Sequence, residues 1–426
     1  MEDEPSAMRP DLQPATRMMG HGYDPARLEG AVKPPIFLTS TYAFPNAAAG
    51  KRHFQALAGK SDPLGNDAPG NPASLVYARF NGPNQRILEE RLAVFEGAEA
   101  ALGFSSGMSA ITTLLMSFCR PGDVVVHSGP LYAAVETVLH QILGEFGVRF
   151  LDFPAAASPA EIADALARAK TMGRVALIYL ESPANPTNVL VDVEAVAQAR
   201  DAAFPEAPPP IAIDNTFLGP VFQKPLRHGA DLVLYSLTKY VGGHSDLVAG
   251  AVVGPARLLT PVRMQRNMFG TIVDAHTAWM LLRSLETVDL RMRRSAENAA
   301  RICRFLRAHP KVERVGYPGD LADDPGPQGD IYRRHCTGGG STFSLYLKGG
   351  EREAFGFLDS LRIARLAVSL GGNETLASAP AAMTHLSVPE ARRAQLGIAD
   401  NLVRISVGIE DADDLIADMA QALERI

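Results

Sequence analysis

The chain has 426 residues, of which 46% are hydrophobic and 21% are charged, and it carries a net charge of −6. That length is too great for one hydrophobic core and predicts two or three domains in a soluble globular protein. The acidic balance excludes the strongly basic surfaces typical of proteins that bind nucleic acid or anionic membranes.

Cysteine usage and the apolar runs indicate the compartment. Cys119, Cys303 and Cys336 lie far apart, with neither metal-ligand spacing nor a disulfide framework, which is typical of a reducing cytoplasm. The N-terminus lacks the apolar core of a signal peptide, and the longest apolar runs are too short to span a bilayer. We therefore expect a cytoplasmic protein with no membrane or nucleic-acid partner and no metal site.

The N-terminal segment predicts an arm followed by a long loop. Residues 1 to about 30 are polar and contain proline. Residues 45–75 are rich in alanine, glycine, proline, asparagine and aspartate, a composition typical of loops. We expect this arm and loop to occupy residues 1–70.

Helical and strand patterns alternate from about residue 85 to 255. Helices are expected over 84–96, over 159–170 with Ser158 as N-cap and Glu161 in a capping box, and over 193–203. Short apolar runs predict strands at 124–127, 175–180, 211–213, before Ser236, and at 249–253. Strands separated by helices predict a mostly parallel sheet, covered by helices on both faces, in a large α/β domain over residues 71–265.

The pattern changes after about residue 265. Residues 277–308 predict a long linking helix, and 341–347 and 402–407 alternate like half-buried strands. Residues 411–426 predict a final amphipathic helix. We expect a smaller α+β domain over residues 266–426.

Lys239 is the first candidate site residue, because it follows an apolar strand and stands among hydroxyl residues. Burial favours the neutral amine of a lysine, and one use for that amine is an imine bond with an aldehyde cofactor. The hydroxyls of Ser236 and Thr238 suit a phosphate. This combination indicates pyridoxal 5′-phosphate (PLP), although an ordinary strand-to-loop turn is the better reading of this stretch alone.

Further polar residues fall where the predicted strands end or helices begin. Asp214 is suited to pair with a protonated pyridine nitrogen, and the small residues around Gly107 expose N–H groups to an anion. Tyr132 is suited to stack on a pyridine ring, and Asn185 to donate to a phenolate oxygen. Each has an ordinary alternative: an Asx turn, an N-cap, a core tyrosine and a rigid turn.

Arg404 lies within an apolar strand and therefore needs an anion, either a substrate carboxylate or an internal salt-bridge partner. Tyr77 and Arg79 follow the predicted loop and suit a phosphate, or simply a surface. Together, these residues supply every part of a PLP site, which separately they do not.

These motifs resemble those of the Cys/Met-metabolism PLP-dependent enzymes, the group of cystathionine γ-synthase, cystathionine γ-lyase and methionine γ-lyase. The resemblance runs from about Thr16 to the C-terminus. The matching stretches are 34–42, 77–79, 104–108, 181–187, 214–217, 236–240, 369–372 and 404–408. It implies a PLP fold-type I, aminotransferase-like subunit and a homotetramer, a dimer of dimers with active sites shared between subunits.

The resemblance also implies residue roles. Lys239 holds PLP and moves protons, Asp214 binds the pyridine nitrogen, and Tyr132 stacks on the ring and protonates the leaving group. The other implied cofactor contacts, mostly at the phosphate, are Ser106, Gly107, Met108, Asn185, Thr216, Ser236 and Thr238, with Tyr77 and Arg79 reaching the neighbouring subunit's phosphate. The implied substrate contacts are Asn185, Ser369 and Arg404.

Several departures from the family pattern bear on the reaction, which the resemblance implies to be γ-elimination or γ-replacement. Thr137 stands where cystathionine-handling members tend to carry an arginine, and Ala134 where methionine γ-lyases tend to carry a cysteine. Val368 is apolar, as in methionine γ-lyases, and Gly372 stands where O-acetylhomoserine sulfhydrylases tend to be acidic. The hypothesis is a methionine γ-lyase-like enzyme for a monocarboxylic sulfur or O-acyl-homoserine substrate. The alternatives are a cystathionine γ-synthase or O-acyl-homoserine sulfhydrylase, and a PLP-binding relative without catalytic activity.

Overall fold

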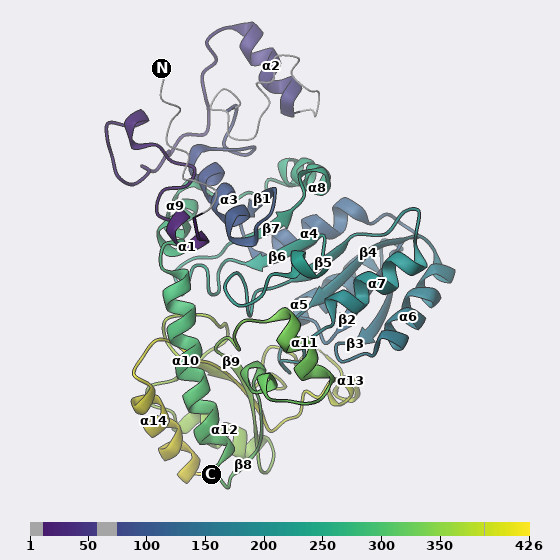
Figure 1. Ribbon diagram of the computed structural model, residues 1–426, viewed down its shortest axis with the longest axis vertical. Coiled ribbons are helices and arrows are strands. Elements are labelled where there is room, and N and C mark those ends of the chain that lie inside the picture. The colour runs from purple at the N-terminus through teal and green to yellow at the C-terminus, as the bar shows by residue number, and fades with distance from the viewer. Residues whose placement is uncertain (1–11, 58–74, 387) are drawn as a thin grey trace.

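A computed structural model of the chain describes residues 12–57, 75–386 and 388–426 (Figure 1). The N-terminal part contains α1 (Pro14–Arg17), η1 (Pro25–Arg27) and α2 (Ala47–Leu57). The predicted loop over 45–75 is therefore wrong for its first part, because alanine, the best helix former, outweighs the neighbouring turn residues. The rest of that prediction lies outside the described residues.

A seven-stranded sheet forms the centre of the larger part of the molecule. Its strands are β1 (Ala100–Phe104), β2 (Val124–Gly129), β3 (Arg149–Pro154), β4 (Val175–Glu181), β5 (Ile211–Asp214), β6 (Leu232–Ser236) and β7 (Gly250–Gly254). Their order is β1-β7-β6-β5-β4-β2-β3, and only β7 pairs antiparallel, with β1 and with β6. The predicted mostly parallel sheet is confirmed.

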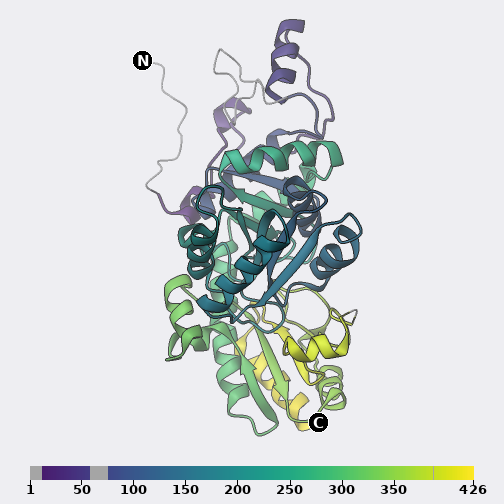
Figure 2. The same cartoon turned by 90° about the vertical axis from the view of Figure 1, so that its right-hand side faces the viewer.

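Helices cover both faces of this sheet, as Figures 1 and 2 show. Successive strand residues face opposite ways, so Val124 and Val126 join one apolar cluster and Val125 the other. The first cluster takes in α3 (Pro83–Glu96), α6 (Pro159–Met172) and α7 (Val193–Ala203). The second takes in α4 (Gly107–Phe118), α5 (Ala133–Thr137), the π-helical η3 (Val138–Leu143) and α8 (Ala256–Phe269). The helices predicted over 84–96, 159–170 and 193–203 are confirmed.

A five-stranded sheet forms the centre of the C-terminal part. Its order is β10 (Arg365–Leu366), β11 (Leu376–Ser378), β12 (Leu402–Ser406), β9 (Thr342–Leu347) and β8 (Val312–Gly316). The predicted strands at 341–347 and 402–407 are therefore present, but every residue of β9 and β12 is buried rather than half of them. The cover includes α12 (Glu351–Ser360) on one face and residues near α13 (Glu390–Gln395) on the other.

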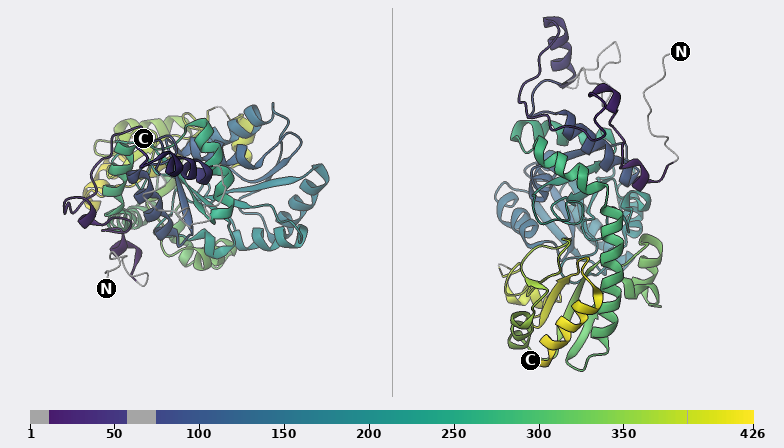
Figure 3. Two further views of the ribbon diagram at one scale, coloured as in Figure 1. Left: turned by 90° about the horizontal axis from the view of Figure 1, so that it is seen from above. Right: turned by 90° about the vertical axis from the view of Figure 1, so that its left-hand side faces the viewer.

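The helix predicted over 277–308 is two helices, α9 (Ala275–Leu285) and α10 (Val288–Arg307). The break falls at Glu286 and Thr287, which end one helix and begin the next. Figure 3 shows α10 running down the side of the molecule beside α14 (Ala412–Glu424), which fulfils the predicted final helix. Shorter elements complete the described chain: η4 (Pro225–His228), η5 (Pro318–Ala322) and α11 (Pro327–His335). Among the described residues, no helix has the length and apolar character needed to cross a membrane.

Candidate active site

Three neighbouring parallel strands end at one edge of the larger sheet and bring polar residues together there. Glu181 at the end of β4 stands opposite Asp214 at the end of β5, and Asp214 stands opposite Leu234 of β6. Lys239 follows the end of β6, with its N–H donating to the Ser236 carbonyl. Ligands of α/β sheets bind at such carboxyl ends, so this edge is the candidate site.

The Lys239 amine lies inside this edge and is poised between its two protonation states. Its Nζ donates to the Ser369 Oγ at 2.7 Å. Burial and the Arg404 guanidinium lower the pKa of Lys239 to about 8, although the Asp214 carboxylate opposes them. At that pKa about a tenth of the amine is neutral at pH 7, and the neutral form is the one that forms an imine.

Ser369 is held in a backbone conformation that side chains avoid. Its φ is 95°, in the left-handed region, where a non-glycine residue costs on the order of 1–3 kcal/mol. Two contacts hold it there: its hydroxyl accepts from Lys239 and its carbonyl accepts from Arg404 Nη2 at 2.9 Å. The strain therefore lies between the predicted cofactor lysine and the predicted substrate arginine.

Arg404 reaches the same edge from β12 in the smaller sheet. Its Nη1 donates to the Asn185 Oδ1 at 3.1 Å, and burial lowers its pKa to about 10. Within the described part of the chain, no ion pair joins Arg404 to a carboxylate. The internal salt bridge considered from the sequence is thus absent there, and a buried positive charge is left to suit an anionic ligand.

The start of α4 lies against the end of β6 and leaves a cradle. A Cβ on Gly107 would lie 3.0 Å from the Ser236 Cβ, so only glycine keeps this gap open. The Thr216 hydroxyl accepts from the Ser236 N–H at 2.9 Å, which brings a third predicted cofactor contact alongside. Met108 follows Gly107 in α4, whose N-terminus favours an anion.

Two of the hydroxyls predicted to contact the cofactor also form hydrogen bonds with backbone groups. The Ser106 hydroxyl caps α4 by accepting from the Ser109 N–H at 2.9 Å. The Thr238 hydroxyl accepts from the Ala249 N–H at 3.0 Å and donates to the Ala249 carbonyl at 3.2 Å. Because a phosphate accepts hydrogen bonds, Thr238 would have to release the Ala249 carbonyl before its proton could reach one, whereas Ser106 keeps its proton while it caps α4.

Asp214 is positioned by the turn that follows it. Its Oδ1 accepts from the Thr216 N–H at 2.9 Å. Burial raises the pKa of Asp214, against the lowering effects of Thr216 and of Lys239. Taken with the Gly107 cradle and the Lys239 amine, this carboxyl completes a set of groups that fits PLP: an amine, a partner for a pyridinium and an anion-binding helix start.

Glu181 is a residue that the sequence reading quoted in a motif but did not place in the site. Its Oε2 accepts from the Tyr132 N–H at 2.8 Å, and its Oε1 accepts from the Asn185 N–H at 3.0 Å. It therefore fixes the backbone of two predicted site residues at once. The available signal was its place at a strand end, the same signal that identified Asp214.

We expect Glu181→Gln to lower kcat/KM by up to about 10²-fold, because a misplacement near 1 Å has that effect. An amide replaces one of the two acceptor oxygens with a donor, which faces a backbone N–H and displaces either Tyr132 or Asn185. Initial-rate kinetics measure the loss. Glu161→Gln, which alters the capping box of α6 after the outermost strand β3, is the control. Equal kinetics for both variants would remove Glu181 from a positioning role.

Tyr77 and Arg79 lie elsewhere in the subunit. Tyr77 pairs with Thr41 in an isolated β-bridge and packs edge to face on Phe80, with ring centroids 6.2 Å apart. The Arg79 guanidinium lies 4.4 Å from the Phe80 ring centroid and donates to the Asn267 carbonyl. Their predicted role at a neighbouring subunit's phosphate remains a prediction.

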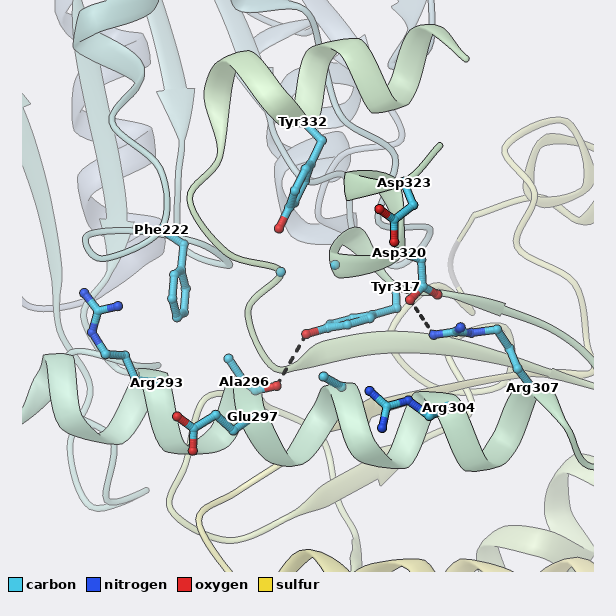
Figure 4. Close-up of a pocket in the computed structure, with 13 residues that line it drawn as sticks. Phe222, Arg293, Ala296, Glu297, Arg304, Arg307, Tyr317, Asp320, Asp323 and Tyr332 are labelled. Atoms are coloured by element: carbon cyan, nitrogen blue, oxygen red, sulfur yellow. Dashed lines mark hydrogen bonds and ion pairs between the residues drawn. The ribbon is translucent and has the colours of Figure 1, made fainter. Parts of the chain in front are cut away.

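A separate cavity of about 690 Å³ lies between α10, η5 and α11 (Figure 4). Its lining includes Arg304, Tyr317 and Asp320, and Asp320 is already paired with Arg307. None of the predicted site residues lines it. The cavity is therefore distinct from the candidate active site.

Comparison with known proteins gives a consistent result. The L-methionine gamma-lyase of Pseudomonas putida is 40% identical over 414 residues, which cover 96% of this chain and 97% of that protein. The cystathionine gamma-lyase of Sus scrofa is 35% identical, over 96% of this chain and 93% of that protein. A cystathionine gamma synthase structure from Xanthomonas oryzae pv. oryzae, in complex with aminoacrylate and cysteine, superposes with a TM-score of 0.85. That structure is 34% identical and covers 97% of this chain and 98% of its own.

The family model described as Cys/Met metabolism PLP-dependent enzyme matches residues 15–424, nearly the whole described chain. This match accounts for the lysine, carboxyl and helix start that converge at the sheet edge. The chain belongs to the Cys/Met metabolism PLP-dependent enzyme family.

Proposed function

We propose that this enzyme catalyses methionine γ-lyase-like γ-elimination. Its substrate would be a monocarboxylic sulfur amino acid or an O-acyl-homoserine, and with methionine the products would be a thiol, 2-oxobutanoate and ammonia. The observation that carries the proposal is Arg404, buried without a carboxylate partner in the described residues and joined through Ser369 to Lys239. The 40% identity to an L-methionine gamma-lyase supports the choice of reaction.

The proposed cofactor contacts follow from the positions of the chain's own groups. Bound PLP supplies an electron sink for negative charge at the substrate's α and then β carbon. Lys239 would hold it through Nζ, Asp214 at the pyridine nitrogen and Tyr132 on the ring face. The phosphate would be held at the start of α4 and end of β6 by Ser106, Gly107, Met108, Thr216, Ser236 and Thr238.

The substrate would be oriented by groups that now bond to one another. The Arg404 guanidinium would donate two hydrogen bonds to the α-carboxylate of the substrate, with Asn185 and Ser369 beside it. Lys239, freed when the substrate amine takes its place, would remove the α-proton at Nζ and help remove the β-proton. The Tyr132 phenol, whose residue is 40% exposed at this edge, would protonate the leaving sulfur.

We expect covalent attachment of PLP to the apoenzyme to accelerate roughly tenfold from pH 7 to pH 9, since a pKa of about 8 raises the neutral fraction of the amine from about one tenth to about nine tenths across that range. The sign follows from the reaction: the neutral amine attacks, and its fraction rises with pH. Stopped-flow absorbance of the attached cofactor measures the rate, with Lys239→Ala as the blank. A profile that rises only near pH 10 would show an unperturbed lysine.

Thr137 bears on the choice between methionine and cystathionine. Threonine is uncharged and its hydroxyl proton is already donated to the Ala133 carbonyl at 3.1 Å, so it offers neither a charge nor a free donor to a second substrate carboxylate. We expect kcat/KM for methionine to exceed that for cystathionine. Thr137→Arg should raise the cystathionine value about tenfold or more, because a hydrogen bond to a charged group contributes about 1.5–3 kcal/mol.

Rates of 2-oxobutanoate release from methionine, homocysteine, cystathionine and O-acetylhomoserine, with and without added thiol, test this proposal. Thr137→Val is the matched control, because it keeps the shape of threonine without adding charge. Consumption of O-acetylhomoserine only in the presence of thiol, without release of 2-oxobutanoate, would favour the sulfhydrylase alternative. Formation of cystathionine alone would favour the synthase. PLP binding without turnover of any amino acid would favour a non-catalytic relative.

We also propose a cytoplasmic homotetramer, a dimer of dimers with shared sites. The three cysteines, which are all free, suit a reducing compartment. Tyr77, which is 41% exposed, is available to a second subunit.

A mixing experiment tests the shared sites. In an equal mixture of Lys239→Ala and Arg79→Ala subunits, a shared site predicts recovery of about a quarter of the activity, since half the dimers regain one of their two sites intact. Sites built within single subunits would recover none, and sedimentation measures the assembly size.

A further inference from the structure

Three side chains of metal-ligating type gather next to the helix that begins after Tyr132. His127 comes from β2, Glu136 from α5 and His140 from η3. One potential ligand atom from each lies within 4.8 Å of the other two. None of the three has a role in the proposed reaction.

His127 is buried with one ring nitrogen satisfied and the other free. Its Nδ1 lies 3.0 Å from the Ser128 carbonyl, which only accepts, so the proton resides on Nδ1. Its Nε2 therefore presents a lone pair, and it has no hydrogen-bond partner in the described part of the chain. Burial lowers the pKa of His127, which keeps the ring neutral. A backbone carbonyl that fixes the tautomer while the opposite nitrogen stays free is the usual arrangement of a metal-bound histidine.

Glu136 supplies a second buried acceptor without a partner. Its Oε1 makes no hydrogen bond to any described residue, while its Oε2 lies 3.2 Å from the His140 Nε2. Burial raises the pKa of Glu136, but His140, His127 and the more distant Arg392 guanidinium outweigh it, so the net shift is downward and the group is a carboxylate. Arg392 is itself paired with Asp152 rather than with Glu136. The His127 Nε2 and the Glu136 Oε1 are thus two buried acceptors without a partner among the described residues, and burial of such atoms is costly unless a cation or a hydrogen-bond donor lies between them.

We propose that His127, Glu136 and His140 bind a divalent transition-metal ion such as Zn²⁺. Two imidazole nitrogens and one carboxylate are a common zinc ligand set, with a fourth position left for water. Imidazole ligands favour zinc and its neighbours over calcium or magnesium. The His140 side chain is 50% exposed, which gives the ion a route from solvent.

A second cluster of the same residue types shows what distinguishes this one. Glu194, His228 and His335 also lie within 4.8 Å of one another. There, however, Arg334 pairs with Glu194 and His228 lies 2.9 Å from the same carboxylate. A cationic side chain already neutralises that cluster, so we propose no ion there and use it as the control.

A bound ion would fasten α5 and η3 to β2. Because α5 begins immediately after Tyr132, the ion would restrain the segment that carries this residue. Binding to the folded state alone raises its stability, so added Zn²⁺ should raise the unfolding temperature. This inference does not depend on the reaction proposed above.

The test uses purified holoenzyme stripped of metal by a chelator and then dialysed against Zn²⁺ or Co²⁺. We expect about one ion per subunit, since the cluster offers one complete ligand set. The visible absorption bands of bound Co²⁺ should be those of a four-coordinate ion. His140→Asn and Glu136→Gln, which alter the more accessible ligands, should weaken binding by at least about tenfold. Both variants should also lose the rise in unfolding temperature.

The control is His228→Asn, which makes the same type of change in the cluster of Glu194, His228 and His335, where Arg334 pairs with the carboxylate. It should leave the stoichiometry and affinity unchanged. Failure of the holoenzyme to bind Zn²⁺ or Co²⁺ would overturn the proposal and leave a bridging water as the donor between His127 and Glu136. Equal binding by the parent and His140→Asn would overturn it too, because the ion would then lie elsewhere.

Discussion

Lys239→Ala is expected to lower the rate of 2-oxobutanoate release by more than about 10³-fold, because it removes both the covalent anchor of the cofactor and the group that moves protons. The Lys239 amine donates to Ser369 and is influenced by the charge of Asp214, and no other lysine of the described residues donates to Ser369. The assay uses excess PLP, so that weaker cofactor binding does not account for the loss.

Two controls sharpen this result. Lys348→Ala removes an exposed lysine of the C-terminal part and should leave the rate unchanged. Added small primary amines should restore part of the lost rate, because they replace the missing proton carrier. Retention of the rate to within tenfold in Lys239→Ala would contradict the assignment.

Arg404→Lys is expected to raise KM for methionine about 30- to 150-fold, which corresponds to about 2–3 kcal/mol of lost charge-assisted hydrogen bonding. Lysine preserves the charge but lacks the planar fork that now reaches Asn185 and Ser369 from two nitrogens. We expect the larger effect in KM rather than in kcat, since the carboxylate is held throughout the reaction.

Arg314→Lys is the matched control for this substitution. Arg314 belongs to the same small sheet, but its guanidinium stacks on the Tyr346 ring rather than facing the candidate site. Its replacement should leave KM within about twofold of the parent value, because surface substitutions are close to neutral. Equal effects of the two substitutions, or an unchanged KM in Arg404→Lys, would mean that Arg404 does not hold the substrate.

The sequence predicts most of the larger sheet because its buried strands are short, apolar and bounded by helices. It does not predict β1 and β3: β1 contains a glycine and β3 exposes alternate residues, so neither reads as a buried apolar run. Asp214 and Lys239 could be placed in one site because the carboxyl ends of neighbouring parallel strands share an edge.

Long-range contacts and backbone conformations were beyond prediction from residue patterns. Arg404 and Asn185 are 219 positions apart, and they meet only because β12 of the smaller sheet lies next to the turn that follows β4 of the larger one. The positive φ of Ser369 has no local sequence signal, because serine gives no reason to expect it. The cluster of His127, Glu136 and His140 is not predictable for a similar reason: a strand and two successive helical segments supply its members, without a zinc-motif spacing.

The measurement that tests the central claim most directly is the product balance from L-methionine with purified holoenzyme and no added thiol. The proposed γ-elimination predicts methanethiol, 2-oxobutanoate and ammonia in equal amounts, with no product from the Lys239→Ala variant. Thiol release without matching 2-oxobutanoate, or no product from methionine at all, would contradict it.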